Sequence, residues 1–129
     1  MVCGGRAAEG AGFFFPPTVL ADVHRDMTPV REEIFGPVLS ATPFDAEEQA
    51  IAAANETVYG LAGSVWTRDI SRAHRVVGAI RAGLLWVNAH GVPDPAVPFG
   101  GYKQSGWGRE QGREAIDGFT ELKSVMVRI

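Results

Sequence analysis

Glu33 and Phe35 are the residues whose types and spacing most directly suggest ligand chemistry, and they lie within the segment Glu32–Val38. A carboxylate can accept two hydrogen bonds from the vicinal hydroxyls of a ribose, and a nearby aromatic ring can pack against a flat part of the same ligand. The Gly36–Pro37 pair predicts a turn that holds both side chains in a fixed relation. The alternative is structural, namely a surface glutamate at a helix end beside a core phenylalanine. Composition alone favours this alternative, because exposed glutamate is the norm.

A second candidate region is the glycine-rich stretch Pro98–Glu110, which reads PFGGYKQSGWGRE. Glycine permits positive φ and close backbone approach, so Gly100–Gly101 and Gly106–Gly108 are predicted to form tight bends. Arg109 and Glu110 are expected to open a helix. The loop Asn88–Val97 that leads into this stretch follows an apolar strand, and ligand-binding residues concentrate on loops held by rigid elements.

Other kinds of chemistry find little support. The histidines at positions 24, 74 and 90 have no spacing suited to a metal pair. The pair Gly106 and Gly108 lacks the third glycine and the preceding strand of a dinucleotide-binding fingerprint. Cys3, in VCGGR, is interpreted as a structural residue, since an unpaired cysteine is usually a small packing residue.

Length and charge narrow the class of protein further. The chain has 129 residues, 46% of them hydrophobic, which fits one globular domain. A formal charge of −3 without a cluster of basic residues argues against a nucleic-acid or anionic-membrane partner. The apolar run Phe13–Phe15 is too short to span a bilayer, and the first residues carry no signal-peptide stretch. A single cysteine fits a cytoplasmic location.

Strand-like and helix-like segments alternate, which predicts an α/β fold. Strands are expected at Phe13–Leu20, Val38–Phe44, Ala62–Trp66 and Leu84–Val87, and a half-exposed strand ends the chain at Val125–Ile129.

Two helices are expected between these strands. The first is Ala46–Asn55, introduced by a capping box of Asp45 and Glu48. The second begins after Asp69 or Ser71 and is closed by a glycine at position 83. Tyr59–Leu61 is expected to turn the chain, and Gly108–Phe119 is expected to be helical.

Both motifs resemble blocks of the aldehyde dehydrogenase superfamily. The stretch Pro98–Glu110 is similar to the family's C-terminal glycine-rich loop, and EEIFGPV at Glu32–Val38 is similar to an element that the family carries upstream of it. The likeness extends from Cys3 to Ile129. It implies the C-terminal portion of the three-layer α/β/α catalytic domain at residues 1–119, and an oligomerisation strand at residues 120–129 that pairs with a neighbouring subunit.

The resemblance also implies roles for individual residues. Glu33 and Phe35 would contact the nicotinamide ribose of NAD or NADP. The loop Asn88–Val97 would line the aldehyde tunnel, which makes His90, Pro93 and Asp94 candidates for substrate contact, with Phe99 beside the tunnel or anchoring the loop. The pattern from His90 to Gly101 resembles the branch that includes phenylacetaldehyde-type dehydrogenases.

The likeness covers only about the last quarter of such an enzyme. The nucleotide-binding domain, the nucleophilic cysteine, the general-base glutamate and the oxyanion-hole asparagine would lie outside it. We therefore expect an NAD(P)-dependent oxidoreductase that forms carboxylic acids from aldehydes, of which this chain alone is inactive and marginally stable. The alternative is a truncated, non-catalytic relative that acts as a docking module. A free-standing nucleotide-binding domain is disfavoured.

Overall fold

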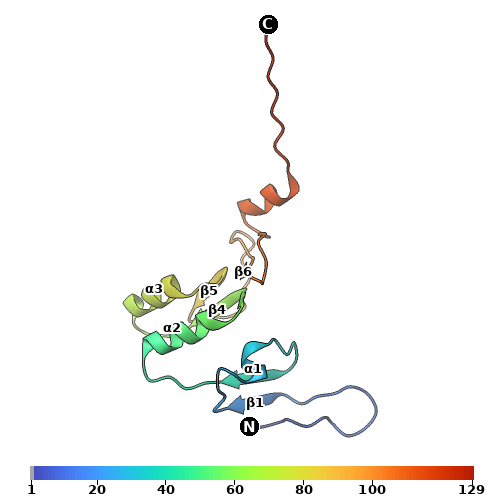
Figure 1. Cartoon of the computed structure of the whole chain (residues 1–129), viewed down its shortest axis with the longest axis vertical. Coiled ribbons are helices and arrows are strands. Elements are labelled where there is room, and N and C mark those ends of the chain that lie inside the picture. Colours follow the sequence, from blue (N-terminus) through green and yellow to red (C-terminus); the bar gives the residue numbers. More distant parts are fainter. Residues whose placement is uncertain (1) are drawn as a thin grey trace. The chain divides into compact units, whose positions relative to one another are not determined.

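The computed structural model describes residues 2–129, and it divides into two compact units, one ending at Ala53 and one running from Ala54 to Ile129. Figure 1 shows their helices and strands in chain order. Helices and strands alternate, as the sequence predicts for an α/β chain.

The first unit is built on a parallel pair of strands, β1 (Thr18–Ala21) and β2 (Val38–Ala41), in which Thr18 lies opposite Val38. The single-turn helix α1 (Thr28–Arg31) lies between them in sequence and starts with a proline in its first turn, where the missing N–H costs nothing. Strand β1 begins later than predicted because Pro16 and Pro17 cannot donate ladder hydrogen bonds.

Thr18 fixes the start of β1. It is the buried polar residue of the described chain, at 4% exposure. Its hydroxyl accepts a hydrogen bond from the Gly5 amide at 2.8 Å and donates one to the Pro16 carbonyl at 3.0 Å. A Cβ at Gly4 would collide with the Thr18 side chain, and Gly4 has a φ of +72°. The segment around Cys3 is therefore folded back against β1 by backbone fit.

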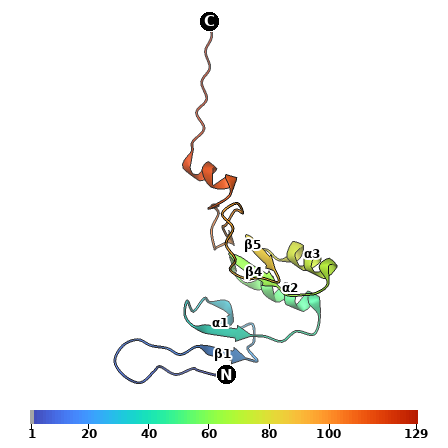
Figure 2. The same ribbon diagram turned by 180° about the vertical axis from the view of Figure 1, so that it is seen from behind.

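The second unit contains a strand–helix–strand unit. Strand β4 (Ala62–Val65) pairs in parallel with β5 (Leu84–Val87), and helix α3 (Ile70–Ala79) connects them. Figure 2 shows β4 and β5 side by side, with α3 next to them. Asp69 caps α3, since its carboxylate accepts a hydrogen bond from the Arg72 amide at 3.1 Å. This bond holds the pKa of Asp69 below its ordinary value of 3.8.

Helix α2 (Glu47–Glu56) precedes this unit. The predicted capping box, in which the Glu48 side chain would accept from the Asp45 amide, is wrong. The Asp45 amide donates instead to the Gln49 side chain at 3.0 Å. The expected turn at Tyr59 is also wrong. Tyr59–Gly60 forms strand β3, which pairs antiparallel with β6 (Tyr102–Lys103).

The C-terminal predictions need correction as well. Arg109 and Glu110 do not open a helix, because Glu110 exchanges two backbone hydrogen bonds of 2.7 Å with Phe99. The helical turn is the 3-10 helix η1 (Arg113–Phe119). Residues 120–129 follow as extended chain that pairs with no strand among the described residues. A strand exists only where a partner supplies the ladder, so their role as an oligomerisation strand stays a prediction.

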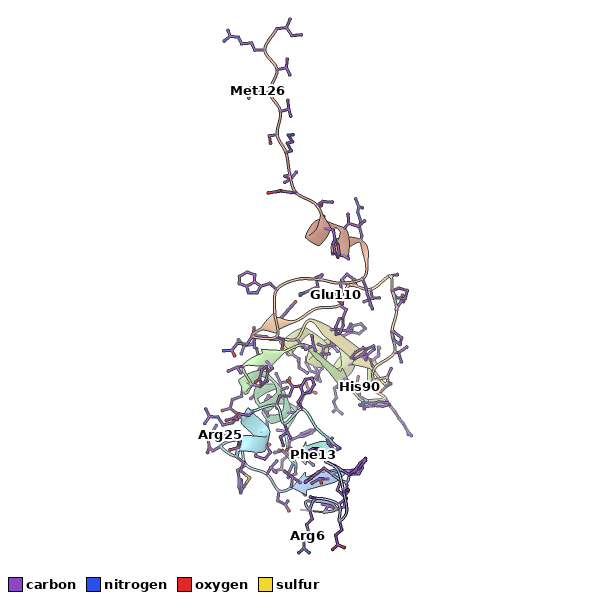
Figure 3. All side chains as sticks on the ribbon, turned by 90° about the vertical axis from the view of Figure 1, so that its right-hand side faces the viewer. Arg6, Phe13, Arg25, His90, Glu110 and Met126 are labelled. Carbon is purple, nitrogen blue, oxygen red and sulfur yellow. The ribbon has the colours of Figure 1, made fainter. Side chains whose placement is uncertain are left out.

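The hydrophobic core is very small. Among the described residues, only Val23, Ala73 and Val76 are buried hydrophobic residues, and no large side chain is completely buried. The aromatic run Phe13–Phe15 lies outside this core: Phe13 is fully exposed and Phe14 is 72% exposed, and Phe13 lies in the N-terminal loop (Figure 3). Each short parallel pair presents two faces, and parallel sheets are normally covered on both.

We expect the purified 129-residue chain to be marginally stable, because so little apolar surface is removed from water. It should bind a hydrophobic dye at room temperature and unfold over a broad range. Differential scanning calorimetry and dye fluorescence would measure this. A sharp, cooperative unfolding transition at high temperature would contradict the expectation.

Candidate functional site

The predicted ribose-binding residues lie on a short turn between α1 and β2. The Glu32 amide closes α1 on the Thr28 carbonyl at 2.9 Å, and the Val38 amide bonds the Gly36 carbonyl at 2.7 Å. Between these two fixed ends, the Glu33 side chain is exposed and the Phe35 ring is 91% exposed. Phe35 also has a φ of +55°, an uncommon conformation for a bulky residue.

Phe35 does not occupy a core position among the described residues, and its role as a cofactor contact stays a prediction. An aromatic ring held outward by a strained backbone, beside an exposed carboxylate, is available to a ligand. Backbone strain of this kind persists where the surrounding structure imposes it and is frequent at ligand sites. The exposed carboxylate of Glu33 can offer hydrogen-bond acceptors, and the exposed ring of Phe35 can offer a flat apolar surface.

The predicted substrate residues belong to the second unit, on the loop that follows β5. The loop is anchored at its start by Asn88, whose side chain accepts from the Thr67 amide and donates to the Thr67 carbonyl, both at 2.9 Å. Further along, the Trp86 indole donates to the Val92 carbonyl at 3.1 Å. Asp94 then makes a local turn by accepting from the Ala96 amide at 2.9 Å.

An open hollow of about 550 Å³ lies against this loop. Its wall contains three of the four residues predicted for substrate contact: Pro93, Asp94 and Phe99. The rest of the lining is almost entirely apolar and comes from β5, the loop and one later residue: Leu84, Leu85, Trp86, Ala89, Gly91, Val92, Val97 and Gln111. His90 is not part of the wall. Its Nδ1 atom lies 3.1 Å from the Ser64 hydroxyl instead.

The glycine-rich stretch is organised by Arg109, for which the sequence predicts only a helix start. Its guanidinium donates to the carbonyls of Gly101, Trp107 and Gly108 at 3.0, 3.3 and 2.8 Å. It also lies 5.5 Å from the centre of the Tyr102 ring, a favourable cation–π distance. One cation thus closes the loop on itself.

Lys103 is a second organising residue that the sequence did not single out. Its ammonium donates to the carbonyls of Asn55 and Thr57, at 3.0 and 2.9 Å, at the end of α2. Partial desolvation lowers the pKa of Lys103, and the neighbouring positive charge of Arg81 lowers it further. The only sequence signals for these two residues were basic side chains among glycines.

Cys3 is not packed in the interior, where an unpaired cysteine usually lies. Cys3 is exposed, and its backbone forms an isolated antiparallel bridge with Val19. No group of three or more histidine, cysteine or acidic side chains gathers at a possible metal site within residues 2–129. Across that same range, no helix is long and apolar enough to cross a membrane.

Comparison with known proteins identifies the family of this chain. The family model described as "Aldehyde dehydrogenase family" matches residues 1–125. The chain belongs to the aldehyde dehydrogenase family. It is therefore related to a family of oxidoreductase enzymes, and the matched range includes both sequence motifs, Glu32–Val38 and Pro98–Glu110.

Individual relatives are also named as aldehyde dehydrogenases. A betaine aldehyde dehydrogenase of Cereibacter sphaeroides is 51% identical over 98% of this chain and 26% of its own length. The solved structure of a Mycobacterium tuberculosis aldehyde dehydrogenase complexed with NAD+ is 53% identical, with a TM-score of 0.89 over 98% of this chain and 26% of that one. A P. syringae indole-3-acetaldehyde dehydrogenase, in complex with NAD+, is 46% identical, with a TM-score of 0.93 over 99% and 26%.

The chain thus spans about a quarter of the length of these aldehyde dehydrogenases. The likeness confirms that it has the fold of a portion of the family's α/β catalytic domain. The names of the relatives do not single out the phenylacetaldehyde-type branch, so that assignment stays a prediction.

We expect Gly100→Ala to disrupt the glycine-rich loop, because a Cβ at this position would overlap the Gly108 carbonyl oxygen. The cost should be about 1–3 kcal/mol, as for other overpacked sites. Gly108→Ala is the matched control, since no atom lies within 4 Å of its Cβ position. Tryptophan fluorescence during denaturant unfolding would compare them. Equal stability of the two variants would contradict the close contact.

Proposed function

We propose that this chain forms the C-terminal quarter of an NAD(P)-dependent aldehyde dehydrogenase that oxidises a small-molecule aldehyde to a carboxylic acid. The observation that carries the proposal is its likeness, at 53% identity and a TM-score of 0.89, to one quarter of an aldehyde dehydrogenase solved with NAD+. In such an enzyme the nicotinamide cofactor accepts the hydride that leaves the substrate.

Glu33 and Phe35 are the proposed cofactor contacts. The exposed carboxylate suits the two hydroxyls of the nicotinamide ribose, and the outward ring of Phe35 suits the flat nicotinamide. This donor and acceptor chemistry is the same for NAD and NADP, which differ at the other ribose, so the proposal covers both.

Pro93, Asp94 and Phe99 are the proposed substrate contacts. They share the wall of one hollow whose lining is mainly apolar, and binding sites for small molecules are typically apolar with few polar groups. The relatives are named for betaine aldehyde and for indole-3-acetaldehyde. We therefore propose an aldehyde with a sizeable organic group, with phenylacetaldehyde-type substrates as the first to test.

The isolated chain is proposed to be inactive. The nucleophile and the nucleotide-binding domain of the family would lie outside the residues that resemble it, and one ribose contact is too little to offset the entropy of association with the cofactor. A cytoplasmic location, suggested by the single cysteine, is part of the same proposal.

A second candidate function is non-catalytic docking onto another subunit. It is favoured by residues 120–129, in which Leu122, Met126 and Ile129 are almost fully exposed. An extended apolar segment of this kind can add a strand to a sheet edge. The same segment would serve a homo-oligomer of a complete enzyme or a complex with a full-length aldehyde dehydrogenase subunit.

The first experiment is the intact mass of the native polypeptide, captured with an antibody against residues 120–129. A species several times heavier than 13.8 kDa that reduces NAD+ or NADP+ when given an aldehyde would support the enzymatic proposal. A species at 13.8 kDa that co-purifies with a larger dehydrogenase would support docking and would contradict the catalytic role.

For the larger polypeptide, we expect Glu33→Gln to raise the KM for the nicotinamide cofactor about tenfold, because a hydrogen bond to a charged acceptor contributes roughly 1.5–3 kcal/mol. Glu32→Gln is the matched control, because it makes the same chemical change at the neighbouring residue. The contact by which Glu32 closes helix α1 is made by its backbone amide, which the substitution keeps. Steady-state kinetics with varied cofactor would measure both. A KM that changes equally in the two variants would exclude a specific role for Glu33.

A further inference from the structure

His90 makes two contacts that tie the loop after β5 to the strand pair. Its Nδ1 atom lies 3.1 Å from the Ser64 hydroxyl, which belongs to β4. Its ring also meets the Trp86 ring of β5 edge to face, with 5.3 Å between the ring centres and 60° between the planes. Ser64 and Trp86 are directly opposite each other in the parallel ladder. One imidazole thus bridges a single register position of the two strands, at the site labelled in Figure 3.

The backbone around His90 is folded to bring the ring to this position. Asn88, two residues before it, has a φ of +53°, and Gly91, directly after it, has a φ of +67°. Left-handed conformations are unusual for residues other than glycine. The Asn88 side chain fixes the start of the loop by two hydrogen bonds to the Thr67 backbone. The backbone is therefore left-handed at two positions within four residues, with the imidazole held between them.

The residues on both sides of His90 line the hollow, whereas His90 itself does not. Ala89 precedes it, and the run from Gly91 to Asp94 follows it, all in the wall. Trp86 belongs to the same wall and makes the edge-to-face contact with the imidazole. A shift of the His90 ring would therefore move the wall on both sides of it without removing any atom from the lining.

We infer that His90, held by Ser64 and Trp86, is a positioning residue that fixes one wall of the substrate hollow and so selects among aldehydes by their girth. This inference rests on the proposed function of the hollow. It replaces direct substrate contact by His90 with an indirect effect through the loop. The hydroxyl–imidazole bond and the ring contact are the two elements to separate by mutation.

The test uses the native polypeptide with four variants. Ser64→Ala and His90→Phe each remove the hydrogen bond, and His90→Phe keeps a ring beside Trp86. The double variant closes a mutant cycle. His90→Asn keeps a polar group near the Nδ1 position but removes the ring. Ser71→Ala and His74→Phe, at exposed positions on α3, are matched controls for the two chemical changes.

For a bulky aromatic aldehyde, we expect Ser64→Ala and His90→Phe each to raise KM about three- to tenfold. For acetaldehyde, kcat and KM should stay within about twofold, which a general loss of folding would not produce. The double variant should resemble either single variant, because residues in one contact are not additive. His90→Asn should retain part of the selectivity. Equal effects on both aldehydes, or additive effects in the cycle, would overturn the inference.

Hydrogen–deuterium exchange of residues 86–94, followed by mass spectrometry, tests the contact without any catalytic readout. Exchange should be about fivefold faster in Ser64→Ala than in the unmodified protein or in Ser71→Ala, because local opening governs exchange. Unchanged exchange would overturn the inference even if aldehydes are oxidised. If exchange rises but the unmodified polypeptide oxidises no aldehyde, the positioning contact stands, while the proposed function and the selectivity that depends on it both fail.

Discussion

Close backbone contact between glycines is the constraint on which the second unit depends. The Gly83 amide donates to the Gly60 carbonyl at 3.0 Å, and a Cβ on Gly83 would overlap the Gly100 carbonyl. Three segments that are distant in sequence thus meet where no side chain fits. This crossing aligns β3 with β6 and sets where β5 begins. Because the loop that lines the hollow starts at the end of β5, the same contact sets the position of the proposed substrate site.

Cations then replace apolar packing as the means of holding the glycine-rich loop. Arg109 binds three carbonyls of its own loop, and Lys103 binds two carbonyls at the end of α2. Such charge-assisted bonds are stronger than neutral ones, and they satisfy carbonyls of the glycine-rich loop and of the end of α2. This explains how a loop with almost no buried side chains keeps a defined shape. It also explains why the aromatic side chain of Trp107 can remain 95% exposed beside it.

Sequence reasoning was most accurate where local physics decides the structure. Strand β5 has the predicted bounds, and Asp69 caps α3, as an acidic residue before an amphipathic run suggests. It failed where a distant partner decides. Gly83 was predicted to close a helix, yet α3 ends before it, and Gly83 is needed for the contact with Gly100. Likewise, Tyr59 forms a strand only because Lys103 lies opposite it. The candidate site residues were proposed through motif resemblance, whereas Ser64 carried no signal, since a serine in a strand gains meaning only from the histidine that reaches it.

The exposed surfaces of the chain connect its fold with its proposed role. A parallel strand pair with one helix beside it cannot cover both faces of its strands, so apolar side chains remain in contact with water. Leu84, Leu85 and Trp86 face the open hollow for this reason. In a complete catalytic domain, further layers would cover such faces, and part of the hollow would be enclosed. A wall held by its own loop contacts, as His90 holds this one, would keep its shape while the other side of the hollow is supplied by different residues. The positioning inferred for His90 therefore requires only contacts that the chain makes within itself, whereas the proposed cofactor binding at Glu33 and Phe35 requires residues from elsewhere.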